Sequence, residues 1–316
     1  MADPAERKGG RVRPEAGAET VAVIDIGSNA VRMAVAQLRG DRVEHLESLN
    51  QPVNLGRDTF TGGSIGRETM EDCVSILRGY QRVLLEYGVD RPDRIRAVAT
   101  SAVREAGNRL QFLDRVEIGT GIRVEPIDEA EVNRLVFMCV NPLIQGNKKL
   151  AGGRSLVVEV GGGSTELLLV HKGGVAQSLV FHLGSLRLHE MMESMQAPAE
   201  SQRRLMQSHI DRTVELMKDR LPRQCMHLVA IGGDARFAAE QLKPSWADRH
   251  IARLSVSDLE ELTHCILEQS VDDLVLRYRM SYPDAETIGP ALAAYVALAR
   301  ALERKTVYVT DTNLRD

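Results

Sequence analysis

The chain has 316 residues, of which 43% are hydrophobic and 27% charged, and its formal net charge at pH 7 is −4. This length supports two ordinary domains with sizeable cores, and the composition excludes a wholly disordered chain. The acidic balance argues against indiscriminate nucleic-acid binding, and no apolar run reaches membrane length. The 4 cysteines have no paired spacing, which indicates neither a zinc site nor a disulfide framework, so we expect a reducing cytoplasm.

The elements of the first half alternate between strand and helix after a polar start. Residues 1–19 are rich in Arg, Gly, Pro and Glu without an apolar period, and we expect a disordered tail there rather than a signal peptide. For residues 20–150 we then expect, in chain order, strands at 21–26, 31–38 and 43–50, a helix at 66–87 closed by Gly88, a strand at 95–100, a helix at 101–116, a strand at 122–127 and a helix at 128–140 ended by Pro142.

The second half restarts the same order of elements after the polar, glycine-bearing stretch 146–153. We expect strands at 156–160, 166–170 and 175–181, helices at 184–196 and 199–220, a strand at 226–231, helices at 234–241, 257–278 and 284–303, and a strand at 306–310. The repetition predicts an α/β fold with two duplicated domains, 20–150 and 151–316, and a ligand between the copies.

Each copy has a glycine-bearing loop directly after its first strand. The first loop reads Asp25-Ile-Gly-Ser-Asn-Ala-Val-Arg32 and the second Glu159-Val-Gly-Gly-Gly-Ser-Thr-Glu166. Glycines let backbone N–H groups approach an anion, hydroxyls and amides add donors, and the carboxylate before each loop can hold a divalent cation. Either loop by itself is more simply a hairpin turn, but two in corresponding places predict a polyphosphate clamp.

These loops, together with Thr100-Ser-Ala-Val-Arg-Glu-Ala-Gly-Asn108 and Leu183-Gly-Ser-Leu-Arg187, resemble the Ppx/GppA family of exopolyphosphatases and guanosine pentaphosphate phosphohydrolases. The resemblance spans roughly residues 20–316. It implies two ribonuclease-H-like domains of the actin and sugar-kinase superfamily, with an interdomain cleft that closes on a phosphate chain. Longer members of the family carry a further helical domain, so the chain is expected to be the short, two-domain form.

The resemblance also implies the roles of individual residues. Phosphate would be bound by Gly27, Ser28, Asn29, Arg32 and Arg104 in the first domain and by Gly162, Gly163, Ser164 and Thr165 in the second. Mg²⁺ would be held by Asp25, Glu159 and Glu166. Without the resemblance, Arg104 reads as a solvated or salt-bridged surface arginine.

The main departure from the family pattern concerns catalysis. Members usually carry Gly-x-Glu-Glu-Ala-Arg-Leu, whose second glutamate is taken as the base that activates water, but Val132 occupies that position here. The carboxylates left as candidates for a catalytic role are Glu131, Glu159 and Glu166. Glu131 has a structural alternative, since Asp128 and Glu131 form a capping box at a helix start. Asp234, in the superfamily's nucleotide loop, reads equally well as the N-cap of the following helix.

Three functions therefore remain open. The first is an acid-anhydride hydrolase that uses Mg²⁺ to remove terminal phosphate from inorganic polyphosphate or guanosine pentaphosphate. The second is a catalytically impaired sensor that binds polyphosphate or a guanosine penta- or tetraphosphate alarmone, and the third is an ATP-dependent small-molecule kinase. We expect no nucleic-acid or membrane partner, and a homodimer is left open.

Overall fold

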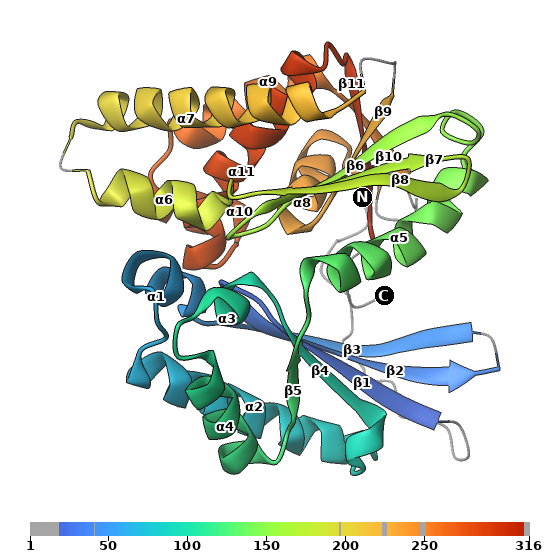
Figure 1. The fold of residues 1–316 in the computed structure, drawn as a ribbon, viewed down its shortest axis with the longest axis vertical. Coiled ribbons are helices and arrows are strands. Elements are labelled where there is room, and N and C mark those ends of the chain that lie inside the picture. Colours follow the sequence, from blue (N-terminus) through green and yellow to red (C-terminus); the bar gives the residue numbers. More distant parts are fainter. Residues whose placement is uncertain (1–18, 41, 196, 223–225, 247–250, 313–316) are drawn as a thin grey trace, which may run out of the picture. The chain divides into compact units, whose positions relative to one another are not determined.

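The computed structural model describes residues 19–312, apart from 41, 196, 223–225 and 247–250. The expected disordered tail therefore lies, except for Glu19, outside the described residues. Contacts divide the chain into two compact units, each with its own sheet (Figure 1): the first holds residues 19–55 and 64–126, and the second holds 56–63 and the described residues from Ile127 to Thr312. This grouping places the helix that begins at Glu129 with the second unit; the domain boundary at residue 150 stays a prediction.

The first unit is built on a five-stranded sheet. In chain order its elements are β1 (Glu19–Ile26), β2 (Ala30–Arg39), β3 (Arg42–Pro52), α2 (Arg67–Glu86), the short 3₁₀ helix η1 (Pro92–Arg94), β4 (Ile95–Ala99), α3 (Ser101–Glu105), α4 (Arg109–Thr120) and β5 (Val124–Pro126).

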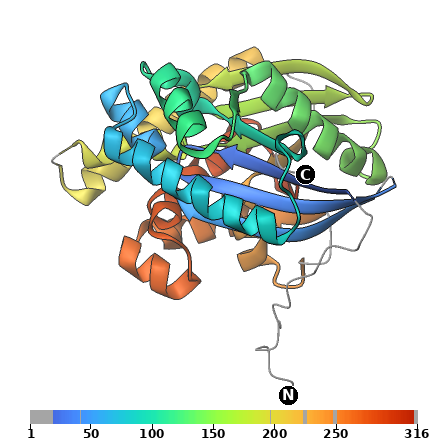
Figure 2. The same cartoon turned by 90° about the horizontal axis from the view of Figure 1, so that it is seen from below.

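The strand order of this sheet is β3-β2-β1-β4-β5. β1, β2 and β3 form an antiparallel meander, and β4 and β5 run parallel to β1. Figure 2 shows α2 lying across one face of the sheet. Its apolar stripe is buried there, and the hydroxyl of Tyr80 donates to the C=O of Val31 in β2. The stripe recurs every three or four residues, which is the spacing that predicted this helix.

The second unit is built on a six-stranded sheet. In chain order its elements are α1 (Leu55–Gly62), α5 (Glu129–Gly146), β6 (Arg154–Val160), β7 (Thr165–His171), β8 (Gly174–Phe181), α6 (Ser185–Glu193), α7 (Ala199–Arg220), β9 (His227–Ile231), α8 (Gly233–Leu242), β10 (Ile251–Ser255), α9 (Val256–Leu267), α10 (Val271–Tyr278), α11 (Tyr282–Ala301) and β11 (Thr306–Thr310).

Its strand order, β10-β11-β9-β6-β7-β8, repeats the plan of the first unit. β6, β7 and β8 form the antiparallel meander, β9 and β11 run parallel to β6, and β10 is added at the edge, antiparallel to β11. An antiparallel meander followed by parallel strands is the arrangement of a ribonuclease-H-like domain. The repeated order confirms the predicted α/β fold class and the internal duplication.

The core of the second unit surrounds α11, the helix predicted at 284–303, which is buried on almost all of its circumference. Tyr295 on this helix is almost completely buried, and its hydroxyl joins two strands of the sheet. The oxygen accepts from the Val160 N–H at 2.9 Å, and the O–H donates to the Ile231 C=O at 2.7 Å. Burial raises the pKa of this hydroxyl well above its ordinary value, so it stays protonated and keeps its donor role.

Two of the predicted helices are each divided into two shorter helices in the structure. The helix expected at 101–116 ends at Glu105 and restarts at Arg109, because the Asn108 side chain exchanges two hydrogen bonds with the Ile65 backbone. The helix expected at 257–278 also divides in two, and Ser270 caps the second part by accepting from the Asp273 N–H. The Ser-x-x-Asp capping motif can be recognised in the sequence. The Asn108 contact cannot be recognised there, because it joins distant segments.

Three further features correct the sequence analysis. Pro142 does not end α5, which continues to Gly146, since the helix buries Val140 and Ile144 on either side of the proline and this packing outweighs one lost hydrogen bond. The helix α1 and the edge strand β10 were not predicted at all. Both are short and lack an apolar repeat long enough to show a period.

We expect Tyr295→Phe to lower the free energy of unfolding by about 1–3 kcal/mol, because it leaves a buried N–H and a buried C=O without their shared partner. Urea unfolding measures the difference. Tyr308→Phe is the matched control, since Tyr308 is buried but its hydroxyl has no hydrogen-bond partner among the described residues. Equal stabilities for the two variants would contradict the bridging role of Tyr295.

Candidate functional site

The first loop, the turn between β1 and β2, is fixed by bonds on several sides. The Gly27 N–H donates to the Ala30 C=O at 3.0 Å, and the Asn29 C=O accepts an N–H from the segment that follows β3. Ser28 is buried, with its Oγ 3.3 Å from the Oγ of Ser101, the first residue of α3. The loop therefore lies at the carboxyl ends of β1 and β4, the edge where α/β sheets bind their ligands.

Charged side chains flank this loop. Asp25 and Arg32 are directly opposite in the β1–β2 register, and the Arg32 Nη1 lies 3.8 Å from the Asp25 Oδ2. Arg104 is half-buried on α3, the helix whose first residue contacts Ser28. The phosphate-binding residues predicted for the first domain thus lie on the β1–β2 hairpin or on α3.

The second loop, residues 161–164 between β6 and β7, closes in the same way. The Gly161 N–H donates to the Ser164 C=O at 2.8 Å. Three successive carbonyls of the loop accept hydrogen bonds from the first turn of α6: Gly161 from the Ser185 N–H at 2.9 Å, Gly162 from the Leu186 N–H at 3.1 Å, and Gly163 from the Arg187 Nε–H at 2.7 Å. The loop therefore satisfies N–H donors that a helix N-terminus otherwise leaves open.

Peptide geometry then fixes where the N–H groups of the second loop point. In a trans peptide the C=O and the N–H point in opposite directions, and the described chain has no cis peptide bond. Because three carbonyls face α6, the N–H groups of Gly162, Gly163 and Ser164 point away from it. No acceptor for these three N–H groups exists among the residues that the structure describes. Successive N–H groups on one side form a concave site suited to an anion.

The hydroxyls of the second loop make internal bonds. The Ser164 Oγ donates to the Glu166 Oε1 at 2.7 Å, and the Thr165 Oγ1 donates to the Leu183 C=O. Both side chains are buried. In this arrangement the hydroxyls hold the loop in shape, which leaves the backbone N–H groups as the donors that a ligand could use.

Two of the predicted metal ligands face each other across the second hairpin. Glu159 and Glu166 are directly opposite in the β6–β7 register, which places their Cβ atoms on one face of the sheet about 4.5–5.5 Å apart. The equivalent pair in the first unit, Asp25 and Arg32, has opposite charges and needs no counterion. Two opposed carboxylates repel each other unless a proton or cation compensates them.

This donor set fits Mg²⁺, which commonly takes one or two carboxylates and completes its shell with water. Glu159 and Glu166 would supply the carboxylates in the second unit, while Asp25, the third expected ligand, belongs to the first unit. Over the described residues, no group of three or more His, Cys, Asp or Glu side chains is arranged to hold a metal.

The neighbouring loop, after β9, corrects one prediction. Gly232, not Asp234, is the N-cap of α8, and Asp234 lies in the first turn, where a negative charge is favourable at the positive end of the helix dipole. Gly232 has φ 99°, a conformation suited to glycine. A Cβ there would lie 3.6 Å from the Glu159 Cγ, so this backbone runs close beside the carboxylate side chain.

The first turn of α5 holds the residues expected near catalysis. Asp128 caps the helix by accepting from the Glu131 N–H at 2.8 Å, which confirms this half of the capping prediction. The carboxylate of Glu131 accepts two bonds from Arg134, at 2.7 and 2.8 Å, so its side chain is engaged along its own helix. Val132 is buried.

Two residues outside the predicted set, Gly184 and Arg187, hold the second loop. A Cβ on Gly184 would lie 2.2 Å from the Gly162 carbonyl oxygen, so only glycine allows α6 to approach the loop this closely. Arg187 bonds the Gly163 carbonyl through its side chain. A signal was available, since both residues lie in the Leu183-Gly-Ser-Leu-Arg187 segment that carried part of the resemblance. Tyr295, by contrast, had no signal in the sequence beyond its place in the helix predicted at 284–303.

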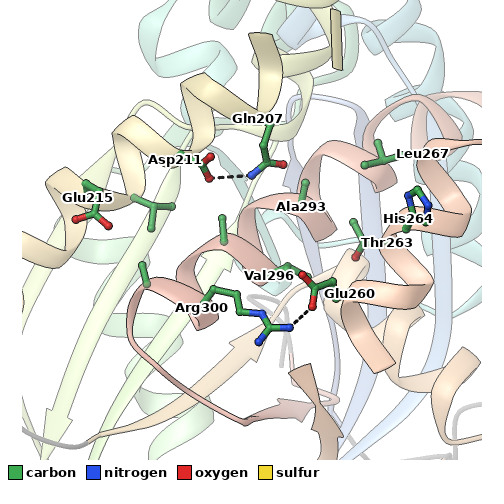
Figure 3. Close-up of a pocket in the computed structure, with 13 residues that line it drawn as sticks. Gln207, Asp211, Glu215, Glu260, Thr263, His264, Leu267, Ala293, Val296 and Arg300 are labelled. Atoms are coloured by element: carbon green, nitrogen blue, oxygen red, sulfur yellow. Dashed lines mark hydrogen bonds and ion pairs between the residues drawn. The ribbon is translucent and has the colours of Figure 1, made fainter. Parts of the chain in front are cut away.

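The second unit also contains a hollow of about 440 Å³ between α7, α9 and α11 (Figure 3). Its lining includes alanines such as Ala293 and the carboxylates of Asp211, Glu215 and Glu260. Arg300, also in the lining, is paired with Glu260, which neutralises its charge. The lining includes none of the described residues of the two glycine loops, so this hollow is distinct from the loop site.

The fold and the two loops define a duplicated α/β protein with candidate phosphate-binding turns, and comparison with known proteins agrees. The model of the Ppx/GppA phosphatase family matches residues 34–316. The chain therefore belongs to the Ppx/GppA phosphatase family, as the sequence motifs indicated.

Relatives and solved structures extend this result. Exopolyphosphatase 1 of Mycobacterium leprae is 31% identical over 146 residues, which cover 46% of this chain and 41% of that protein. The bifunctional 3-dehydroquinate synthase/phosphatase of Fusobacterium nucleatum is 28% identical over 175 residues, which cover 54% of this chain and 26% of that protein. This chain thus matches less than half the length of these curated relatives. The crystal structure of an exopolyphosphatase from Cytophaga hutchinsonii shares the fold with a TM-score of 0.80 at 22% identity, covering 94% of this chain and 95% of that one.

The described helices include none that combines the length and apolarity required to cross a membrane.

We expect Gly184→Ala to lower the free energy of unfolding by about 1–3 kcal/mol, because the new methyl group overlaps loop backbone rather than a flexible side chain. Gly79→Ala on α2 is the control: its Cβ would enter open space, and helix propensity predicts a gain of about 0.5–1 kcal/mol. Thermal and urea unfolding measure both changes. A Gly184→Ala protein as stable as wild type would show that α6 does not grip the loop as described.

Proposed function

We propose that this chain is a phosphohydrolase that uses Mg²⁺ to remove the terminal phosphate of inorganic polyphosphate or guanosine pentaphosphate. The observation that carries this proposal is the second loop, where three N–H groups point away from α6 and two opposed carboxylates lie at the adjoining strand ends. In a member of a phosphatase family, this arrangement suits an anionic substrate with a bound cation. The exopolyphosphatase among its relatives supports polyphosphate as the substrate.

The first unit would supply the remaining phosphate contacts. We propose that its own loop binds a phosphate group of the substrate as well. Arg32 and Arg104 suit this role, because a guanidinium presents a planar pair of donors to two phosphate oxygens and keeps its charge at neutral pH. Gly27, Ser28 and Asn29 would place the phosphate group beside them.

The proposed reaction is attack of water on the terminal phosphorus. A bond forms from the water oxygen to phosphorus, the bond from phosphorus to the bridging oxygen breaks, and the water gives a proton to a base. The carboxylate of Glu131 is held by Arg134, which favours Glu159 or Glu166 as that base. Mg²⁺, when bound, would neutralise phosphate charge that otherwise repels the incoming water.

A sensor is the second candidate, and α5 carries the argument for it. By the resemblance, Val132 takes the position of the family's base, and Glu131 beside it is paired with Arg134. Losing a positioned base costs about 10²- to 10⁴-fold in rate. On this alternative the chain binds polyphosphate or a guanosine alarmone without turning it over. Its cytoplasmic location and its lack of nucleic-acid and membrane partners remain expectations for either function.

One comparison distinguishes the hydrolase from the sensor. We expect wild type to release orthophosphate from long-chain polyphosphate when Mg²⁺ is present and to stop when EDTA removes it. Val132→Glu restores the family's residue, and the hydrolase proposal predicts at most a modest further gain. If wild type binds polyphosphate in a calorimeter but only Val132→Glu hydrolyses it, the sensor is correct instead.

Arg32→Ala should weaken polyphosphate binding about 10- to 100-fold, because one charge-assisted contact is lost, while the melting temperature changes little. Calorimetric titration and thermal unfolding measure the two quantities. Arg39→Ala, at the far end of the same strand, is the matched control and should bind as wild type does. Unchanged binding by Arg32→Ala would remove the first loop from the site.

A further inference from the structure

The helix α1 lies outside the predicted site, but it is connected to the second loop through Arg187 of α6. Residues 56–63 belong to the second unit, although the chain before and after them belongs to the first. They are anchored on α6, where the Arg57 Nε donates to the Glu190 Oε1 at 2.7 Å. The Arg57 Nη2 also lies 3.9 Å from the Glu286 Oε2 on α11. This bonding to Glu190 raises the pKa of the Arg57 guanidinium, so the anchor keeps its charge.

Phe60, one turn further along α1, lies against Arg187. The Arg187 Cζ is 4.0 Å from the centre of the Phe60 ring, which is the distance of a close cation–π contact. The same guanidinium donates from Nε to the Gly163 C=O at 2.7 Å. A single side chain therefore connects α1 to the third carbonyl of the second loop.

This bond to the Gly163 carbonyl differs in kind from the bonds to the other two carbonyls of the loop. Gly161 and Gly162 are bonded by backbone N–H groups, which the helix itself fixes. The Gly163 carbonyl instead depends on a long side chain, and an unrestrained arginine samples many rotamers. The Phe60 ring restricts those rotamers, and through the planar Gly163–Ser164 peptide it sets the direction of the Ser164 N–H.

We propose that Phe60 and Arg187 are positioning residues for phosphate, with α1 acting as a strap that keeps the third N–H donor of the second loop in line. This inference rests on the proposed function, since it assigns the loop a phosphate ligand. Neither side chain is required to take part in the chemical step. Their effect is to keep the loop ready to bind, so that the anion need not reorder it.

The test is Phe60→Leu, which removes the ring while keeping an apolar side chain. We expect the KM for polyphosphate to rise about 3- to 10-fold with kcat little changed, because a positioned donor is lost and the reacting groups are not. Phe60→Trp restores an aromatic face and should recover most of the affinity. Tyr278→Leu is the matched control, because it removes a ring whose centre lies 5.3 Å from the Arg277 Cζ, a cation–π contact that includes no residue of the second loop, and it should leave KM as in wild type.

A second measurement keeps this inference separate from the proposed function. In ¹⁵N NMR spectra of the full chain, the Arg187 Nε–H resonance should shift in Phe60→Leu, and the shift should return toward wild type in Phe60→Trp. If the resonance and KM are both unchanged in Phe60→Leu, the strap does not position the loop and the inference is overturned. If the resonance shifts as expected but wild type neither binds nor hydrolyses polyphosphate, the connection stands and the proposed function fails.

Discussion

The approach of α6 to the second glycine loop is the constraint on which the rest of the candidate site depends. Gly184 allows this approach, because a Cβ at that position would overlap the loop backbone. Three loop carbonyls then accept bonds from the first turn of α6, and the planarity of the peptide bond turns three N–H groups the other way. The direction of these N–H groups is therefore set on the opposite side of the loop, by what its carbonyls bind.

The first hairpin of each unit has the same backbone geometry, but the charged residues beside its loop differ. Both loops close with an N–H bond from the first glycine to the carbonyl three residues later, at 3.0 Å in the first and 2.8 Å in the second. The strand positions before and after each loop are then paired in the same register. In the first unit they carry an aspartate and an arginine, and in the second they carry two glutamates. The pair beside the first loop therefore has no net formal charge, whereas the pair beside the second loop has two negative charges when both glutamates are ionised.

Much of the fold could be predicted because it depends on local pattern. Strand alternation and turn residues predict the two meanders, which begin at residues 19 and 154. Helical spacing of apolar residues predicts α2 and α11. The failures have distant causes. Asn108 breaks a helix by bonding Ile65, and α5 continues past Pro142 because it is packed on both sides of the proline.

For the candidate site, the sequence by itself determined which loops carry glycine, hydroxyl and carboxylate groups, and this was enough to indicate the family. Only the tertiary structure decided what those groups do. It committed the hydroxyls of Ser164 and Thr165 to internal bonds and tied Glu131 to Arg134. It also recruited Phe60 from a segment more than a hundred residues away in the chain. The reason is physical: residue type sets which bonds a group can make, but the partner is chosen by which segments the packed core brings within about 3 Å.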